Sequence, residues 1–428
     1  FNKVLYLIET QYYRQVDTEK LVEGALKGMM ETLDPHSSFM NKDFFTRMQN
    51  DTAGEFGGLG LEVASKDGMI IIITPIEDTP AFRAGIHPKD RIMEINHESI
   101  VGMSLDQAIE KMKGKNGSVV HLGIAREGHS GLKHFNIKRE LIKINPVKSE
   151  MVQGNVAYIR LSQFQKRAAE AVEEALKKLT AQANKQGGLA GIILDLRANP
   201  GGLLDQAVDI SSLFLKDGLV VSTESRDPQN KDIRYVKKQG WKNLTTPIAV
   251  LINGSSASAS EIVAGALQDH HRAIIMGSQS FGKGSVQTVA QLDGGTVVKL
   301  TIAQYMTHNN RRIQGVGITP DINIDDVDPA AFEKAKRPDR WTRERDLRNH
   351  LAATKETPEE KKAREDLEAL DRRQRSDAIE KRNRELKNTK QDDDEDIFRQ
   401  PKPSDDYQVN QAAGLLKAMK VLDPTKKI

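Results

Sequence analysis

The sequence predicts an α/β protein with a mixed sheet and flanking helices, a separate β-rich domain, and helical segments at both ends. Strand and helix patterns alternate over residues 141–328, as is typical of an α/β layer with parallel strands. Glycine-rich turns and short runs of alternating apolar residues fill residues 54–140. Apolar residues recur at helical spacing in residues 1–50 and again in residues 401–428.

Length and composition restrict the class of protein. A chain of 428 residues is long enough for two or three domains. Its 63 Lys and Arg against 60 Asp and Glu give a net charge of +3, which argues against a dedicated nucleic-acid binder. The longest apolar stretch, residues 69–75, is far shorter than the ~20 residues of a membrane-spanning helix. The chain has no cysteine, which excludes disulfides, thiol catalysis and cysteine metal sites.

The N-terminal residues 1–50 are predicted to be helical. Asp17 and Thr18 are suitable residues to begin a second helix, and Asp34-Pro35 is suitable to end it. Because the chain starts with Phe1 and not with methionine, we expect that a targeting segment has been removed.

In the β-rich domain, strands are predicted at residues 69–74 and 91–95, and Val120, Leu122 and Ile124 indicate another. Residues 104–113 form an amphipathic helical pattern that begins with Ser104, a favourable N-cap.

The elements of the α/β layer follow from buried apolar runs and from the helical periodicity between them. The predicted strands are residues 157–161, 191–196, 248–252 and 273–276, and the predicted helices are residues 168–179, 204–215 and 259–268. Residues 329–400 carry dense mixed charge and are predicted to be a solvated helical or partly disordered arm. An amphipathic helix in residues 401–428 ends the chain. Its apolar face and those of the N-terminal helices would suit packing between subunits.

Four serines lie where a buried strand turns into a helix, in GSSASASEIV at residues 254–263. Serine favours helix N-caps, so the run has a simple structural interpretation. A functional interpretation is that one serine is a nucleophile, because a helix N-terminus can stabilise a developing oxyanion.

A serine nucleophile needs a base, and histidine is the first residue type to consider. Asp269, His270 and His271 follow the same helix but lie at its other end, ~15 Å away, and are predicted to cap its C-terminus.

Lys283 lies in GSQSFGKGSVQ at residues 277–287, which nearly matches a phosphate-binding loop. Gly284 replaces the Ser or Thr that would bind magnesium, and the segment that follows is β-rich instead of helical, so nucleotide binding is disfavoured. A desolvated lysine can instead be neutral and accept a proton, as in serine–lysine catalysis. The simpler alternative is a surface lysine in a glycine-rich loop.

A third loop, DLRANPGG at residues 195–202, follows another buried strand. Sheets of this class place ligands at the carboxyl ends of their strands, so a glycine N–H here could serve as a second oxyanion donor. An ordinary tight turn has the same composition.

Taken together, these motifs resemble the carboxyl-terminal processing peptidases, also called tail-specific proteases. The resemblance covers about residues 1–325, roughly three quarters of the chain. The motifs occur in the same order as in that family: LDPHSSF (33–39), GGLGL (57–61), TPAFRAGI (79–86) with DRIMEIN (90–96), DLRANPGG, SASASEIVAGAL (256–267), GSQSFGKGSVQ and GVGITPD (315–321).

The resemblance implies roles for the site residues. Ser258, the middle serine of SASAS, would be the nucleophile, Lys283 the base, and Gln287 the residue that orients Lys283. The oxyanion hole would combine the Ala259 N–H with the N–H of either Gly201 or Gly202. The neighbouring Ser256 and Ser260 would then be structural.

The resemblance also implies a PDZ domain in residues 54–140, which would hold the carboxylate and last side chain of a bound peptide. The residues expected to bind that peptide are Gly57, Gly58, Leu59, Gly60, Leu61, Ile109 and Met112. One departure from the family is Lys89, where glycine usually precedes the aspartate.

The implied function is that of a serine endopeptidase that recognises protein C-terminal segments through the PDZ domain and cleaves envelope proteins near that end. It would need no metal or other cofactor, would act in the bacterial cell envelope, in the periplasm, and would bind no nucleic acid. Members of the family form homo-oligomers or work with lipoprotein adaptors, so an oligomer is expected and an adaptor is a candidate partner. The alternative is a PDZ scaffold, or an adaptor-dependent protease that is inactive in its resting state.

Overall fold

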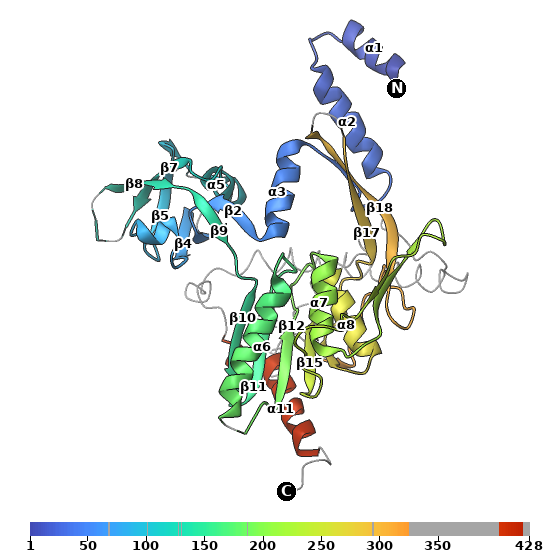
Figure 1. The fold of residues 1–428 in the computed structure, drawn as a ribbon. Helices are drawn as coiled ribbons and strands as arrows, with labels where there is room; N and C mark the ends of the chain where they lie inside the picture. Colours follow the sequence, from blue (N-terminus) through green and yellow to red (C-terminus); the bar gives the residue numbers. More distant parts are fainter. Residues whose placement is uncertain are drawn as a thin grey trace, which may run out of the picture. The chain divides into compact units, whose positions relative to one another are not determined.

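The computed structural model describes residues 1–66, 69–100, 102–126, 128–129, 131–185, 187–292, 295–324 and 402–422 (Figure 1). These residues form two compact units. One contains residues 1–46, 146–324 and 402–422, and the other contains residues 47–145. The charged arm predicted at residues 329–400 lies outside the described residues.

The first unit contains the α/β layer. Its helices are α1 (Asn2–Gln11), α2 (Thr18–Glu31), α6 (Ala168–Asn184), α7 (Leu204–Phe214), α8 (Ala259–Asp269) and α11 (Tyr407–Leu422), with a short 3₁₀ turn at Pro403–Asp405. Its strands are β1 (Ser38–Met40), β10 (Val147–Val152), β11 (Val156–Leu161), β12 (Gly191–Asp195), β13 (Leu219–Ser225), β14 (Ile233–Tyr235), β15 (Ile248–Ile252), β16 (Ile274–Gly277), β17 (Ser285–Gln291), β18 (Val297–Met306) and β19 (Ile322–Asn323). Helix α3 (Lys42–Ala53) runs across the boundary between the units.

The main sheet has the strand order β10-β11-β12-β15-β16-β19, and only its first pair is antiparallel. The predicted mixed sheet is therefore confirmed. Strand residues alternate between the two faces, so Ile192 and Leu194 of β12 pack with the helices α6, α7 and α8. Ile193, between them, packs with α11 on the opposite face, and Figure 1 shows the sheet covered in this way on both sides.

Helix α11 covers the sheet with small residues that allow a close approach. Val409, Ala412 and Leu416 are fully buried against β11, β12 and β15. A Cβ atom on Gly191 of β12 would lie 2.6 Å from the Cβ atom of Leu416, so glycine is required at that crossing. The expectation that this apolar face packs between subunits is therefore wrong, because the face is buried on the sheet of its own chain.

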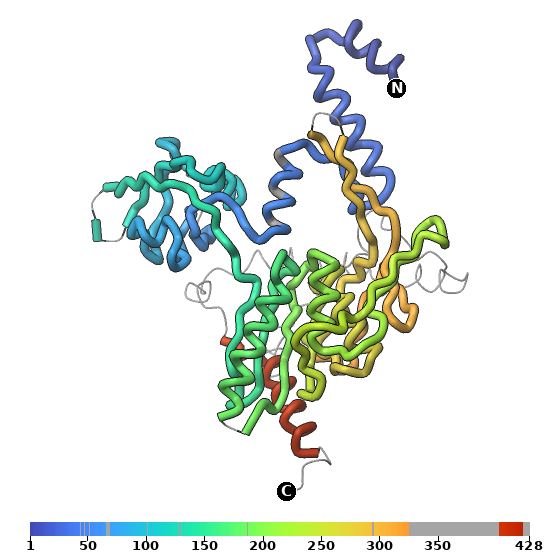
Figure 2. The backbone as a smooth tube through the Cα atoms, in the orientation of Figure 1, coloured from blue at the N-terminus to red at the C-terminus, as the bar shows by residue number. Residues whose placement is uncertain are grey.

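A second sheet has the order β1-β18-β13-β14, with β17 paired to β18. Strand β1 was not predicted, because residues 1–50 were interpreted as helical throughout. Phe39 and Met40 are buried where β1 pairs with β18, and Figure 2 shows this N-terminal segment beside the β17–β18 hairpin. Pairing with a strand some 260 residues away overrides the local helical pattern.

The N-terminal helices are largely exposed. Helix α2 begins as predicted, with the Asp17 side chain accepting hydrogen bonds from the N–H groups of Glu19 and Lys20. Neither α1 nor α2 contains a buried residue. None of the helices that the structure describes combines the length and the apolarity needed to cross a bilayer.

The second unit is the β-rich domain. Its elements are β2 (Glu55–Gly58), β3 (Leu61–Lys66), β4 (Met69–Pro75), α4 (Pro80–Arg83), β5 (Arg91–Ile95), β6 (Glu98–Ser99), α5 (Leu105–Met112), β7 (Val119–Ala125), β8 (Leu132–Lys138) and β9 (Glu140–Lys143). The sheet order is β3-β4-β5-β7-β8, and β2 pairs separately with β9. Ser104 caps α5 as predicted, in a reciprocal pair with Gln107. Lys89 has φ +70°, so the turn keeps the left-handed conformation that glycine would adopt without strain.

Candidate active site

Two loops meet at the carboxyl ends of β12 and β15, where α/β sheets place their ligands. The loop of residues 195–202 follows β12, and the loop of residues 253–258 follows β15. The Ala257 N–H donates to the Asn199 carbonyl at 3.0 Å, and the Ala198 N–H donates to the Asn253 side chain at 3.0 Å. These bonds hold the second loop directly against the first.

Ser258 has a strained backbone conformation. It precedes α8 as its N-cap and has φ 55° and ψ −111°, outside the ordinary regions for a side-chain-bearing residue. Such strain is commonly found at functional sites, where surrounding contacts maintain it. The neighbouring Ser256 and Ser260 are fully buried, and their hydroxyls donate to the carbonyls of Leu196 and Asn199. Those two serines therefore join the loops, while the partly exposed Ser258 does not.

Glu261 joins Ser258 to Lys283. One carboxylate oxygen of this fully buried residue accepts the Ser258 N–H at 2.7 Å and the Lys283 N–H at 2.9 Å. The other oxygen accepts the Gly282 N–H at 2.7 Å and the Ser280 hydroxyl at 2.5 Å. The backbones of Ser258 and Lys283, 25 residues apart in the chain, are thus held on the same atom.

The sequence analysis did not identify Glu261. Its position was visible in the sequence, because Ser258 and Glu261 have the spacing of a capping box. Glu261 also accepts hydrogen bonds from the loop of residues 280–283, and no local sequence pattern indicates that contact. Burial raises the pKa of Glu261 to about 7, although its four hydrogen bonds act in the opposite direction.

A second lysine lies near Lys283. Lys299, on β18, has a lowered pKa, first because it is buried and second because of the charge on Lys283. Coulombic repulsion is mutual, so a cation at Lys299 favours the neutral, proton-accepting form of Lys283.

The loop of residues 195–202 contributes backbone donors. Gly201 has φ +99°, and a Cβ atom there would lie 2.7 Å from the Ala257 carbonyl oxygen and 2.9 Å from the Ala259 nitrogen. The Gly201 N–H donates to the Asn199 side chain at 2.9 Å. The N–H groups of Ala259 and Gly202 donate to no acceptor among the described residues.

Gln287 lies on β17, in the strand that follows Lys283. Its side-chain amide is 3.5 Å from the Thr301 hydroxyl, at the limit of a hydrogen bond. Thr301 donates in turn to Asp34 at 3.1 Å, and Asp34 also accepts from Ser37 at 2.6 Å. The conspicuous LDPHSSF motif is therefore tied to the strand pair that carries Gln287.

The two alternatives from the sequence are not supported by the geometry. His270 is the C-cap residue of α8, as predicted, and its Nε2 lies 2.8 Å from the Leu219 carbonyl oxygen. Asp269 accepts from Thr307 at 2.6 Å, so these residues form no triad with Ser258 at the opposite end of α8. Strand β17, and not a helix, follows Lys283, so the loop lacks the helix N-terminus that holds a phosphate.

The second unit contains a separate pocket of about 270 Å³. It is lined by six of the seven residues predicted to bind a peptide and by four others: Gly58, Leu59, Gly60, Leu61, Ile109 and Met112, with Phe56, Glu62, Val63 and Lys113. Gly57 does not line it, but its carbonyl accepts the Gly114 N–H at 3.0 Å. Strand β3 forms an edge of its sheet beside this pocket. The N–H groups of Leu59 and Gly60 have no acceptor within the described part of the chain.

Three family models match the chain. Residues 155–324 match peptidase family S41, residues 48–125 match the PDZ domain, and residues 1–44 match the N-terminal domain of the activating protease CtpB.

Whole-chain relatives agree with these matches. A carboxy-terminal-processing protease of Bartonella bacilliformis is 43% identical over 357 residues, which cover 83% of this chain and 81% of the relative. The carboxy-terminal processing protease CtpA of Bacillus subtilis is 36% identical over 325 residues, covering 76% and 68%. Among solved structures, the photosystem II D1 C-terminal processing protease matches with 29% identity and a TM-score of 0.45, covering 76% of this chain and 86% of that one.

Proposed function

Because the chain belongs to peptidase family S41 and is a serine peptidase of the carboxy-terminal processing group, we propose that Ser258 is its nucleophile and Lys283 its general base. The observation that carries the proposal is the single Glu261 oxygen that accepts the N–H groups of both residues. It holds the two loops together on one rigid, buried group. The strained backbone of Ser258 and the mutual repulsion between Lys283 and the nearby Lys299 support the same assignment.

The proposed reaction proceeds through an acyl-enzyme. Ser258 Oγ attacks the scissile carbonyl carbon while Lys283 Nζ accepts the hydroxyl proton. Lys283 then donates this proton to the leaving amine, and water hydrolyses the ester in the second half of the reaction. Gln287 orients Lys283, and Thr301, which lies against Gln287, restrains that side chain.

The oxyanion would be stabilised by backbone N–H groups. We assign the Ala259 N–H as one donor, since it lies at the start of α8 and finds no acceptor in the part of the chain that the structure describes. Gly202 supplies the second, because the Gly201 N–H already donates to Asn199. Gly201 instead permits the close approach of the two loops.

The PDZ domain would select substrates by their C-terminal segment. A peptide added along the edge strand β3 would place its last side chain in the apolar pocket of Leu59, Ile109 and Met112. The unused N–H groups of Leu59 and Gly60 would hold its carboxylate. Substrates are then envelope proteins with accessible C-termini, processed in the periplasm by a homo-oligomer, with a lipoprotein as a candidate adaptor.

The test is the cleavage of unfolded casein by the wild type, Ser258→Ala and Lys283→Ala. Both variants are expected to be folded and inactive. Ser149→Ala and Lys238→Ala, two changes of the same kind at exposed positions outside the site, are expected to retain activity. Full activity of the folded Lys283→Ala variant would show that the base lies elsewhere. An inactive wild type would favour the alternative, a protease that rests in an inactive state until an adaptor binds.

A further inference from the structure

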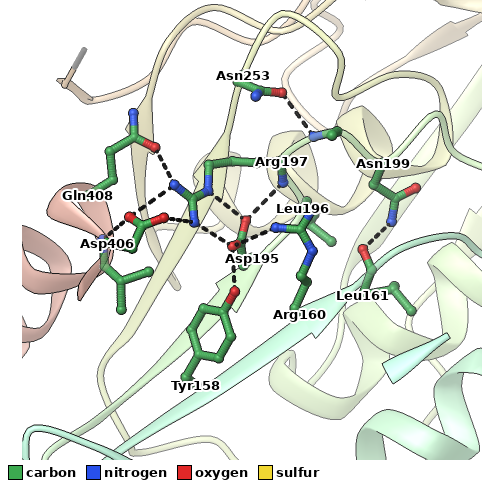
Figure 3. A network of polar contacts seen from close by, with 12 residues as sticks. Tyr158, Arg160, Leu161, Asp195, Leu196, Arg197, Asn199, Asn253, Asp406 and Gln408 are labelled. Atoms are coloured by element: carbon green, nitrogen blue, oxygen red, sulfur yellow. Dashed lines mark hydrogen bonds and ion pairs between the residues drawn. The ribbon is translucent and has the colours of Figure 1, made fainter. Parts of the chain in front are cut away.

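Arg197 connects the active-site loop to the C-terminal segment of the chain (Figure 3). Its guanidinium forms a two-pronged contact with Asp195, with Nε to Oδ1 at 2.9 Å and Nη2 to Oδ2 at 2.7 Å. Its Nη1 donates to Asp406 Oδ1 at 3.1 Å and to Gln408 Oε1 at 2.8 Å, and its Nη2 lies 2.9 Å from Asp406 Oδ2. Asp406 and Gln408 lie more than 200 residues further along the chain.

The network is buried and its charges are matched. The Asp195 side chain is fully buried and also accepts the Tyr158 hydroxyl at 2.7 Å, with Arg160 at 3.4 Å. The Arg197 side chain is only 12% exposed. Burial alone would lower the pKa of Arg197, but the hydrogen bonds and charges of Asp195 and Asp406 outweigh it and raise that pKa. A buried cation in this setting depends on both carboxylates.

Arg197 lies in the same loop as the proposed backbone donor Gly202, five residues before it. Ala198 has φ +55° and is held by Asn253, and Asn199 donates to the Leu161 carbonyl at 2.7 Å (Figure 3). The loop is therefore fixed along residues 198–199 by neighbouring strands and at Arg197 by the C-terminal segment. Among the anchors drawn in Figure 3, those from Asp406 and Gln408 come from the C-terminal segment and not from the loops and strands of the sheet.

We propose that Asp406 and Gln408 are positioning residues for catalysis: through Arg197, the C-terminal segment fixes the loop that presents the Gly202 N–H to the oxyanion. This inference rests on the proposed function, because it assumes that this loop faces the acyl-transfer site of Ser258. It gives the helix α11 a role in the reaction besides covering the sheet.

Asp406→Asn separates this role from a structural one. Asp406 also caps α11 by accepting the Val409 N–H at 3.0 Å, and asparagine is an equally good N-cap. The substitution removes the negative charge that pairs with the Arg197 guanidinium. In one orientation of the new amide, it also places the N–H₂ group against that guanidinium. Asp405→Asn is the matched control, because this exposed neighbour undergoes the same change of charge and its side chain accepts a hydrogen bond from the Ser404 hydroxyl instead of contacting Arg197.

The measurements are casein cleavage over a range of substrate concentrations and the rate at which a fluorophosphonate labels Ser258, with the folded fraction followed by circular dichroism. Asp406→Asn is expected to lower kcat by about 10- to 100-fold with an unchanged KM, since a small displacement of a catalytic group is costly. Labelling should slow in parallel, because the probe's phosphoryl oxygen occupies the oxyanion site. Gln408→Leu should show a smaller loss of the same kind.

The outcomes distinguish this inference from the function on which it rests. Equal kcat values for Asp406→Asn and Asp405→Asn, with Ser258→Ala inactive, would overturn the positioning role and leave the proposed function standing. A loss of kcat that matches a loss of folded protein would also overturn it. Activity in the folded Ser258→Ala variant would instead refute the proposed function, and this inference with it.

Discussion

Ser258 and Glu261 show how few side chains define the catalytic geometry. A carboxylate three residues after the proposed nucleophile fixes the backbone of that residue and the backbone of the proposed base at once. The strain at Ser258 is maintained because the hydroxyls of Ser256 and Ser260 and the Ala257 N–H all donate to carbonyls of the adjacent loop. Single substitutions at this scale therefore have large, specific consequences.

Gly201→Ala is expected to lower kcat/KM by about 100-fold or more, because the loop of Ser258 and Ala259 must move away from the added methyl group. Gly240→Ala is the matched control, since Gly240 has nearly the same φ, +103°, but no atom within 4 Å of the added carbon. Steady-state cleavage of casein by both variants provides the comparison. Activity of Gly201→Ala equal to that of Gly240→Ala would contradict the close approach of the loops.

Glu261 should make stability depend on pH. Its pKa of about 7 in the folded state is above the ordinary value of 4.5, so the folded state binds this proton more tightly than the unfolded state. Its contribution is complete below about pH 4.5 and is lost as the pH rises through 7. Relative to Glu261→Gln, the wild type should therefore lose about 3 kcal/mol of unfolding free energy between pH 5 and pH 8.

Urea unfolding followed by fluorescence at several pH values measures this difference. Glu174→Gln, at an exposed glutamate of α6, should differ from the wild type by a constant amount over the same range. If the difference between wild type and Glu261→Gln is also constant, Glu261 does not titrate as inferred.

At the scale of elements, the pocket of the second unit is lined by the edge strand β3, the helix α5, and residues of β2 and of the turn that leads into β3. β3 provides backbone groups for pairing and α5 provides the apolar wall, so affinity and side-chain preference reside on different elements. The apolar lining favours substrates that end in an apolar residue.

Ile109→Ala should weaken the binding of a peptide with an apolar C-terminal residue by about tenfold, because the mutation removes part of the pocket wall. Val119→Ala is the control, since Val119 is 59% exposed in the same unit and does not line the pocket. Fluorescence anisotropy with the inactive Ser258→Ala protein measures both affinities. A peptide with an amidated C-terminus should bind weakly to all variants; equal binding of the free acid and the amide would refute the carboxylate site.

At the scale of the whole molecule, the N-terminal helices remain incompletely packed. α1 has ten residues and buries none of them, and helices of this length are marginal on their own in water. Large apolar side chains on it are exposed, among them Val4, Tyr6 and Leu7. This supports the proposal that these helices pack against another copy of the chain.

Size-exclusion chromatography with light scattering at micromolar concentration is expected to give the mass of an oligomer. Replacing Tyr6 and Leu7 together by aspartate should shift the mass toward one chain, because charged residues are costly at an apolar interface. Val119→Asp, a change of the same kind in the other unit, should leave the mass unaltered. A monomeric wild type would rule out this assembly.

Much of the fold could be predicted from the sequence because its signals are local. The continuous apolar run of β12, the capping of α2 by Asp17 and of α5 by Ser104, and the turn after each buried strand depend on neighbouring residues alone. The motif order was sufficient to identify the family. The assignments of Ser258, Lys283 and Gln287 came from that resemblance, and they remain predictions.

Other features depend on contacts between residues far apart in the chain, which no local pattern records. Strand β1 exists because β18 provides its partner, and α11 is buried because a glycine in β12 leaves room for Leu416. The choice between Gly201 and Gly202 required the hydrogen bond that already engages Gly201.

By itself, the sequence determined which elements form and which chemical groups are available, since capping, periodicity and turn chemistry act over a few residues. Only the tertiary structure decided which groups meet. Glu261 joins Ser258 to Lys283, and Arg197 joins the active-site loop to Asp406, which is 209 residues away. The physical reason is that a buried charge must find partners wherever the fold brings them.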